Sequence, residues 1–354
     1  MTTNLLFICG SLNQTTQMHQ IAAQLADYRC YFTPFYADGI EDFAAQKGWL
    51  NSTVLGGRHM LDTRAYLDEH QLPVDFRGER RPYDLVVTCS DLIVPRNIRR
   101  KRVVLVQEGM TIPEGPVYHL VKALRFLPRY LANTAASGLS DNYDLFCVAS
   151  EGYRELFIRK GVRPEKIAVT GIPNYDNLAD NFNNSFPFRD YVLVATSANR
   201  ESMQREDRMT FLKRCAQIAD GRPIIFKLHP LEKFERASRE IARIAPEALV
   251  LHRGNVNHMI ANASTVITQK STCTFVALAL EKEVYSQLDL DELHRLMPLQ
   301  NKSDSARRIA NLCRRVLHTP LPLLETLRAV SRSRAKSPAW SRRMPKGRWE
   351  TPNP

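Results

Sequence analysis

The sequence alternates, along nearly its whole length, between short apolar runs and longer amphipathic segments. Runs such as residues 103–107 and 191–196 are almost continuously apolar, which is typical of strands buried on both faces of a parallel sheet. The segments between the runs have helical spacing, as where Met209, Leu212 and Ala216 fall on one helical face. A run and the segment after it have the length of a βαβ unit. The sequence therefore predicts an α/β protein with two Rossmann-like, doubly wound parallel sheets that face a cleft.

The expected strands divide the chain into two halves. The first half should contain strands at residues 5–9, 30–35, 85–89, 103–107, 145–149 and 167–170, and the second half at 191–196, 224–228, 249–251, 266–268 and 284–286. Residues 180–187 are polar and aromatic and end in proline, as linkers do. We therefore expect an N-terminal domain over residues 1–171, a hinge over 172–188, a C-terminal domain over 189–319 and a basic, disordered tail over 320–354.

Charge, cysteine spacing and hydropathy exclude several classes of protein. The net charge is +12, and residues 328–354 hold eight Lys and Arg against Glu350, so the tail is expected to meet an anionic surface. No apolar run approaches the ~20 residues of a membrane span, and the first residues lack the basic stretch of a secretory leader. The seven cysteines have neither Cys-x-x-Cys nor zinc spacing. We expect a cytoplasmic protein with reduced thiols and no bound metal.

A polar segment follows the first expected strand. Gly10 permits a tight turn there, and Asn13, Gln14 and Thr15 open a helix whose free N–H groups favour anions or sugar hydroxyls. The segment is neither a Gly-x-Gly-x-x-Gly dinucleotide fingerprint nor a P-loop. Its unbroken polar run favours a binding segment, and an ordinary turn with a helix cap is the structural alternative.

A carboxylate stands at the end of the strand at residues 103–107. Glu108 could accept a proton from an attacking hydroxyl or hold a substrate hydroxyl, and Gly109 would let a ligand approach the backbone. Capping of a neighbouring helix is the alternative role. His119 is a second candidate base. It lies in residues 116–131, which mix aromatic and basic residues as interfacial helices do, although core packing would also explain them.

Two segments of the second half have the composition of a diphosphate site. Lys227 and His229 end a buried strand, and the proline after them stops further ladder pairing. Residues 268–274 place hydroxyl side chains, among them Ser271 and Thr272, at the start of an apolar helix, where free N–H groups form an anion-binding nest. A structural histidine and an ordinary helix cap are the alternatives.

Several of these segments resemble a known superfamily. Residues 146–176 look like the linker region of GT-B fold enzymes, in particular UDP-N-acetylglucosamine 2-epimerases and CDP-glycerol glycerophosphotransferases. Residues 227–230 resemble the transferase pattern, residues 106–109 the epimerases' His-Val-Glu-Ala-Gly stretch, and residues 266–272 and 277–285 the superfamily's nucleotide-diphosphate loop and helix. The chain lacks the epimerases' Gly-Thr-Arg-Pro-Glu opening, and the transferases' His-Gly pair is Glu108-Gly109 here.

The resemblance implies a metal-independent, glycosyltransferase-like enzyme of the GT-B type that needs no cofactor. It would transfer a sugar or a glycerophosphate-type group from a UDP- or CDP-type donor to a hydroxyl acceptor, with a lipid-linked acceptor as one option, in the synthesis of a cell envelope polysaccharide or glycolipid. Glu108 would be the base, with His119 in reserve. The donor would contact Thr196, Lys227, His229, Ser271, Thr272 and Glu281, and the acceptor Gly10, Asn13, Gln14 and Thr15.

Two other functions fit the same residues. A UDP-sugar 2-epimerase or hydrolase would act on the donor alone. A non-catalytic basic protein would bind a membrane or a nucleic acid through its tail. For the transferase we expect no nucleic-acid partner, and the membrane contact to consider is peripheral, at the inner face of the plasma membrane, through the tail and residues 116–131.

Overall fold

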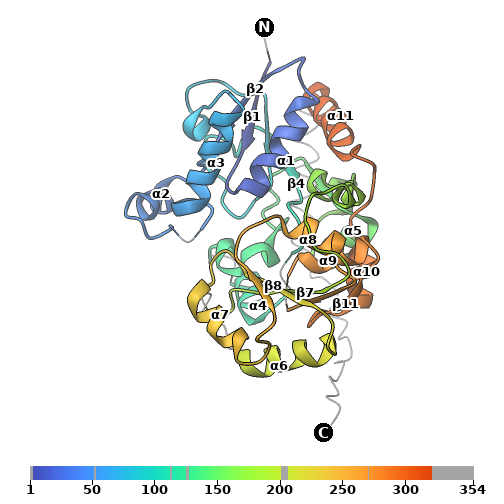
Figure 1. Cartoon of the computed structure of the whole chain (residues 1–354). Helices are drawn as coiled ribbons and strands as arrows, with labels where there is room; N and C mark the ends of the chain where they lie inside the picture. The colour runs from blue at the N-terminus through green and yellow to red at the C-terminus, as the bar shows by residue number, and fades with distance from the viewer. Residues whose placement is uncertain are drawn as a thin grey trace. The chain divides into compact units, whose positions relative to one another are not determined.

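A computed structural model describes residues 3–51, 53–111, 114–124, 127–200, 206–269 and 271–320. Its strands form two parallel sheets, with the order β2-β1-β3-β4-β5-β6 in the first and β11-β10-β7-β8-β9 in the second (Figure 1). The predicted α/β fold class is confirmed, and every predicted strand is present with ends shifted by at most two residues. The strands are β1 (Asn4–Ile8), β2 (Arg29–Thr33), β3 (Leu85–Thr88), β4 (Arg102–Val106), β5 (Leu145–Val148), β6 (Ile167–Val169), β7 (Val192–Ala195), β8 (Ile224–Lys227), β9 (Leu249–Leu251), β10 (Thr265–Thr268) and β11 (Glu283–Tyr285).

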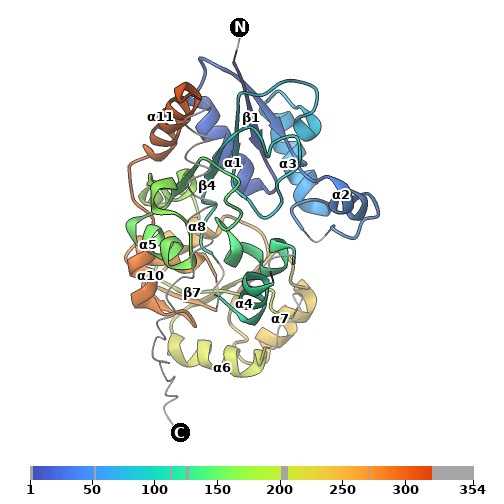
Figure 2. The same ribbon diagram turned by 180° about the vertical axis from the view of Figure 1, so that it is seen from behind.

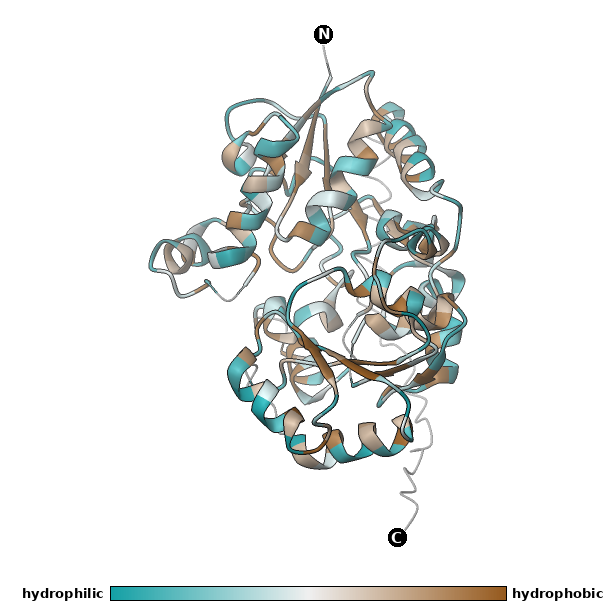
Figure 3. Ribbon diagram, viewed as in Figure 1, coloured by the Kyte–Doolittle hydropathy of each residue, from teal (hydrophilic) through white to brown (hydrophobic). Residues whose placement is uncertain are grey.

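Burial of the central strands explains why their sequences are apolar without alternation. Every residue of β3, β7 and β10 is buried, because helices cover both faces of each sheet. The strands are correspondingly brown in Figure 3, whereas the helices carry polar outer faces. The helices are α1 (Leu12–Ala23), α2 (Gly39–Gln46), α3 (Gly57–Glu69), α4 (Pro116–Ala123), α5 (Glu151–Lys160), α6 (Arg208–Ala219), α7 (Phe234–Ala242), α8 (Val256–Asn262), α9 (Cys273–Ala279), α10 (Leu290–Leu296) and α11 (Ser305–His318).

The amphipathic stretch at residues 116–131 is not one helix. Helix α4 ends at Ala123, and a 3₁₀ segment over Arg129–Ala136 follows Pro128. Proline lacks a backbone N–H and disfavours helical geometry in the residue before it, so the helix cannot run through this point. None of the described helices is long and apolar enough to cross a membrane.

The last described helix packs on the first sheet. Ile309, Cys313 and Val316 of α11 belong to the same buried core as β1 and β4, and Arg314 pairs with Asp27 at 2.8 Å. Figure 2 shows α11 beside α1. The sequence assigned this helix to the C-terminal half, because its apolar stripe predicts burial without saying against which sheet. The chain to Leu317 forms one compact unit, and most of the predicted tail lies outside the described residues.

Helices α5 and α10 meet through a close approach of their backbones. Ser150 caps α5 by accepting from the backbone N–H of Tyr153 at 3.3 Å, and its hydroxyl donates to the carbonyl of Leu296 at 3.2 Å. A Cβ atom added at Gly152 would overlap the carbonyl oxygen of Arg295. A helix that follows β5 is thus joined to one that follows β11.

Gly152→Ala is therefore expected to destabilise the protein by at least about 2 kcal/mol, because overpacking against backbone forces a shift. The free energy of unfolding in urea measures this loss. Gly115→Ala is the matched control: a Cβ there meets nothing within 4 Å, and the expected change is below about 1 kcal/mol. Equal free energies of unfolding for the two variants would contradict the close approach of α5 and α10 at Gly152.

Candidate functional site

The carboxylate of Glu108 is held by the start of α1. Its Oε1 accepts from the Ser11 hydroxyl at 3.1 Å and from Nδ2 of Asn13 at 3.4 Å, and its Oε2 accepts from Nε2 of Gln14 at 2.8 Å. The strands β1 and β4 flank β3, so the segments after them meet at one edge of the sheet. The structure thus brings together two segments that the sequence singled out separately.

Buried glutamines fix the backbone beside this carboxylate. The side chain of Gln107 accepts from the N–H of Ala149 at 3.0 Å and donates to the carbonyl of Gly109 at 2.8 Å. Gln17 donates to the carbonyl of Gln107 at 2.9 Å. The residues on both sides of Glu108 are therefore anchored, and its side chain is presented from a rigid position.

Two of the predicted acceptor residues have structural roles. A Cβ atom at Gly10 would lie 2.6 Å from Oε1 of Gln14 and 3.1 Å from the ring of Tyr36, so a larger residue there would force the Gln14 side chain to move. Thr15 does not face an acceptor: its side chain is 0% exposed, and its hydroxyl lies 3.2 Å from that of Thr63 on α3. The helical rotation of α1 turns Thr15 inward, which the polar run in the sequence did not reveal.

The segment after β6 also reaches α1. Nδ2 of Asn174 donates to both the side-chain and the backbone oxygen of Asn13 at 2.7 Å, and its Oδ1 accepts from Thr16 at 3.2 Å and from Gln20 at 3.0 Å. Asn13 is therefore held from two sides, by Asn174 and by Glu108. The sequence interpreted this segment only as the start of a hinge.

The buried carboxylate of Asp176 fixes the same segment through hydrogen bonds with backbone N–H groups. Asp176 accepts from the backbone N–H of Asn301 at 2.9 Å and from that of Ser305, at the start of α11, at 2.6 Å. Gly171 has φ +77°, and a Cβ atom there would overlap the hydroxyl of Ser305. Residues 171–176 thus form a turn that is locked by the chain just before α11.

Tyr175 lies between these two anchors and faces both halves of the site. A Cβ atom at Gly109 would be 3.5 Å from its hydroxyl, and the side chain of Thr272 is near enough to lower the pKa of that hydroxyl. Burial, with smaller contributions from the charges of Cys273 and Glu108, raises the pKa of Tyr175 to about 12. The phenol is therefore protonated at neutral pH and acts as a hydrogen-bond donor.

The charged end of β8 is near the start of α9. The ammonium of Lys227 donates to the carbonyls of Leu228 at 2.9 Å and His252 at 3.0 Å, and burial lowers its pKa while nearby Cys273 opposes that shift. Burial raises the pKa of the Cys273 thiol, opposed by a hydrogen bond from Ser271 and by the charge of Lys227. Of the residues singled out from the sequence, Lys227 and Ser271 are thus near Cys273, and Thr272 is near Tyr175.

Thr196 and His229 meet at a buried carboxylate instead. Glu232, which is 5% exposed, accepts from the Thr196 hydroxyl and from the backbone N–H of His229 at 2.9 Å. The side chain of His229 accepts from the N–H of Leu231 at 3.2 Å, within its own loop. The other oxygen of Glu232 pairs with buried Arg208 at 3.0 Å.

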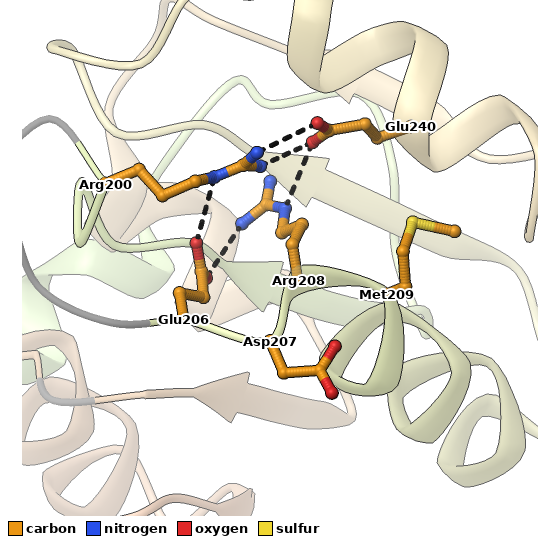
Figure 4. Close-up of a pocket in the computed structure, with 6 residues that line it drawn as sticks. All are labelled: Arg200, Glu206, Asp207, Arg208, Met209 and Glu240. Atoms are coloured by element: carbon orange, nitrogen blue, oxygen red, sulfur yellow. Dashed lines mark hydrogen bonds and ion pairs between the residues drawn. The ribbon is translucent and has the colours of Figure 1, made fainter.

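Arg208 belongs to a ring of side chains with alternating charge, called here the Arg–Glu ring. Arg200 and Arg208 point toward each other between the carboxylates of Glu206 and Glu240 (Figure 4), and Arg200 holds Glu240 through two hydrogen bonds of 3.0 and 2.6 Å. With Glu232, the ring contains more carboxylates than guanidiniums. Its cations are therefore neutralised, and its evident role is to hold the loop after β7 against α7.

Two predicted residues stand apart from these groups. Glu281 follows the C-terminal end of α9, about 10 Å along the helix from Thr272. His119 is exposed on α4, where its ring contacts that of Tyr118 at 5.3 Å between centroids. No described contact joins either residue to Glu108 or Lys227. Within the part of the chain that the structure describes, no three His, Cys, Asp or Glu side chains gather as metal ligands would.

The fold matches that of known nucleotide-sugar enzymes. UDP-GlcNAc 2-epimerase from Neisseria meningitidis, solved bound to UDP-GlcNAc, has a TM-score of 0.52 and 10% identity over 88% of this chain and 100% of its own. MnaA from S. aureus, solved with UDP, has a TM-score of 0.52 and 11% identity over 88% and 95%. The wall teichoic acid polymerase TagF has a TM-score of 0.45 and 11% identity over 94% of this chain and 89% of its own, and this TM-score is too low to support an inference.

These likenesses confirm the GT-B-type fold that the sequence resemblance implied. At 10–11% identity they establish the fold alone. No protein-family model matches the chain, and no curated protein sequence does either.

Sequence reasoning missed Tyr175, Asn174 and the Arg–Glu ring. The signal for the first two was present: Pro173-Asn174-Tyr175-Asp176 is a polar segment at the carboxyl end of a strand, the same pattern that pointed to Glu108 and Lys227. The ring gave no such signal, because its members are charged residues that a sequence places by default on the surface.

Removal of the buried carboxylate in Glu232→Ala should lower the free energy of unfolding by roughly 1–3 kcal/mol, since the Thr196 hydroxyl and the N–H of His229 would lose their acceptor and Arg208 its shortest ion pair. Glu235→Ala, on the exposed first turn of α7, is the control and should change stability by less than about 0.5 kcal/mol. Urea unfolding monitored by circular dichroism measures both. A Glu232→Ala variant with an unchanged free energy of unfolding would show that the Arg–Glu ring does not hold the loop after β7.

Proposed function

We propose that this protein is a metal-independent GT-B transferase, which moves a sugar or a glycerophosphate-type group from a nucleotide-diphosphate donor to a hydroxyl acceptor. One observation carries the proposal. Thr272 and Cys273 at the start of α9 lie near Tyr175, which in turn lies beside Gly109 and near the Glu108 carboxylate, and the cationic end of β8 is near Cys273. This arrangement supports a donor site around Lys227 and the start of α9, with an acceptor site around Glu108 close to it.

The donor half is suited to an anionic leaving group, which is a nucleoside diphosphate when a sugar is transferred and a nucleoside monophosphate when a glycerophosphate-type group is transferred. The Lys227 ammonium has three donors, of which two meet backbone carbonyls, and its lowered pKa reflects partial removal from water. A preorganised cation in such surroundings offsets developing negative charge more strongly than one in water. Ser271 and Thr272 supply hydroxyls at the same place. The solved relatives bound to UDP or UDP-GlcNAc support a UDP-type donor, and a CDP-type donor is the variant to test beside it.

The acceptor half would hold and deprotonate a hydroxyl. Glu108 is only half-buried and is oriented by Ser11, Asn13 and Gln14, which leaves lone pairs of its carboxylate for an acceptor proton. Asn13 is exposed and could contact the same acceptor. Tyr175, protonated at neutral pH, would donate to an oxygen of the donor or of the acceptor between the two halves. No step in this scheme requires a metal.

A second function, epimerisation or hydrolysis of a UDP-sugar, is favoured by the solved structures with matching folds that are themselves UDP-GlcNAc 2-epimerases. Such an enzyme acts without an acceptor. Incubation of the protein with UDP-GlcNAc alone, followed by proton NMR of the anomeric region, distinguishes the two functions. Prompt interconversion or UDP release would replace the transferase proposal by this one.

We further propose that the acceptor belongs to a cell envelope polysaccharide or glycolipid, and that the protein works peripherally at the inner face of the plasma membrane. The basic composition of residues 328–354 supports this placement. A purely non-catalytic binder would behave differently. It would keep its cellular role in Glu108→Ala and Lys227→Ala variants and lose it when residues 328–354 are deleted.

Nucleotide binding should be visible as thermal stabilisation, because a ligand of the native state raises its apparent stability. We expect UDP or CDP at a hundred times its dissociation constant to add about 2.7 kcal/mol, and NAD to add nothing. Lys227→Met should abolish the shift with UDP or CDP. Arg253→Met, which removes an exposed cation that follows β9, is the control and should retain it. A protein that no nucleotide stabilises would contradict the proposed donor site.

Glu108→Gln should separate binding from chemistry. The amide cannot accept the acceptor proton, so we expect turnover to fall at least about a hundredfold while the UDP or CDP shift is unchanged. Release of the nucleotide in the presence of acceptor extracts measures turnover: a nucleoside diphosphate is released if a sugar is transferred, and a nucleoside monophosphate if a glycerophosphate-type group is transferred. His119→Gln tests the reserve base in the same assay: a greater loss there than in Glu108→Gln would transfer the role to His119.

A further inference from the structure

Helix α2 packs against the core through Ala45 but leaves large apolar side chains exposed. None of its residues is buried, although it carries Ile40 and Phe43 on one face. Their exposed fractions are 82% and 52%, and Trp49 just beyond the helix is 71% exposed. The rings of Phe43 and Trp49 contact edge to face at 6.1 Å between centroids. These three residues, called here the α2 surface, form a contiguous exposed patch of the kind that marks a binding surface.

A strongly basic loop adjoins the α2 surface. Residues 96–102 carry Arg96, Arg99, Arg100, Lys101 and Arg102 and no acidic residue. The backbone N–H of Arg96 donates to Oδ2 of Asp38, the N-cap of α2, at 2.7 Å. A cavity of about 290 Å³ is lined jointly by residues 36–39, 77–79 and 95–97, so the start of the basic loop meets the start of α2.

The acidic residues of α2 do not cancel this charge. Asp38 is occupied by the Arg96 backbone, and Asp42 pairs with the guanidinium of Arg77. On the helix itself only Glu41 is left without a described partner. Lys47 adds a cation whose Nζ lies 5.6 Å from the centre of the Phe43 ring. Exposed Arg96 lies next to the start of α2, and exposed Arg100 follows it on the same loop, so cations accompany the apolar residues, which is the pairing of groups that anionic lipid surfaces attract.

We propose that the α2 surface and the loop 96–102 dock on an anionic lipid bilayer. Ile40, Phe43 and Trp49 enter the boundary between headgroups and acyl chains, and Arg96 and Arg100 contact lipid phosphates. A second copy of this chain is a poorer occupant, because twofold contacts would bring the two basic loops face to face. This surface is separate from the tail and from residues 116–131, and it does not depend on the proposed transferase activity.

Fluorescence of Trp49 tests the docking directly. The other two tryptophans, Trp340 and Trp349, lie in the tail, so Trp340→Phe/Trp349→Phe leaves Trp49 as the one indole of the full chain. With phosphatidylglycerol vesicles we expect its emission to move to shorter wavelength, and with phosphatidylcholine vesicles we expect no movement. Because the readout is Trp49 itself, attachment through the basic tail alone does not produce the shift.

Variants in the same background resolve the two contributions. Arg96→Ala/Arg100→Ala should lower the vesicle partition coefficient reported by Trp49 about thirtyfold, at about 1 kcal/mol for each cation. Arg243→Ala/Arg253→Ala removes two exposed cations that lie beyond α7 and β9 and should leave it within about threefold. Ile40→Ser/Phe43→Ser should abolish the shift, and Leu231→Ser/Phe234→Ser, which changes two exposed apolar residues elsewhere, should not.

Two results would overturn the proposal. One is a Trp49 emission that stays unchanged when phosphatidylglycerol vesicles bring the protein down in sedimentation, since the chain would then be attached elsewhere. The other is a dimer in light scattering that Ile40→Ser/Phe43→Ser converts to a monomer, which would assign the surface to a second copy of the chain.

Discussion

The site depends on the buried carboxylate of Asp176. By accepting from two backbone N–H groups just before and at the start of α11, it fixes the turn after β6 from a segment more than a hundred residues later in the chain. Asn174 and Tyr175 are carried on that turn, and they contact α1 on one side and Thr272 on the other. Without this anchor, the turn that carries Asn174 and Tyr175 would lose its fixed position beside α1.

Charge is used in two opposite ways around the second sheet. The Arg–Glu ring neutralises its own cations, which makes it a rigid support for the loop that carries His229. Lys227 lies close by with no paired carboxylate of its own beyond the distant influence of Glu232, and burial lowers its pKa. A buried cation of this kind is unfavourable for the empty protein and is stabilised by an anionic ligand.

Much of this organisation was predictable because parallel sheets place the carboxyl ends of their strands at one edge. That rule led from apolar runs to Glu108, Lys227 and Ser271, and the structure gathers the last two. The rule does not predict which way a helical side chain faces, and Thr15 faces inward although its neighbour Gln14 meets Glu108. It also does not predict ion pairs between residues that are distant in the sequence, such as that of Arg208 with Glu232. The sequence also did not reveal the sheet on which α11 packs, because an amphipathic stripe predicts that one face of a helix is buried but not which sheet covers that face.

The position of α11 has a consequence for the order of folding. Strands β1 to β6 leave the ribosome first, yet the core that they share with Ile309, Cys313 and Val316 stays open until the helix has been synthesised. Contacts between such distant residues close slowly, so the nascent first sheet must remain exposed to chaperones and proteases for most of translation. A chain that ends before residue 305 would lack the helix that completes the core of the first sheet. For the same reason, we expect that the two sheets of the full chain cannot be separated into independently stable fragments.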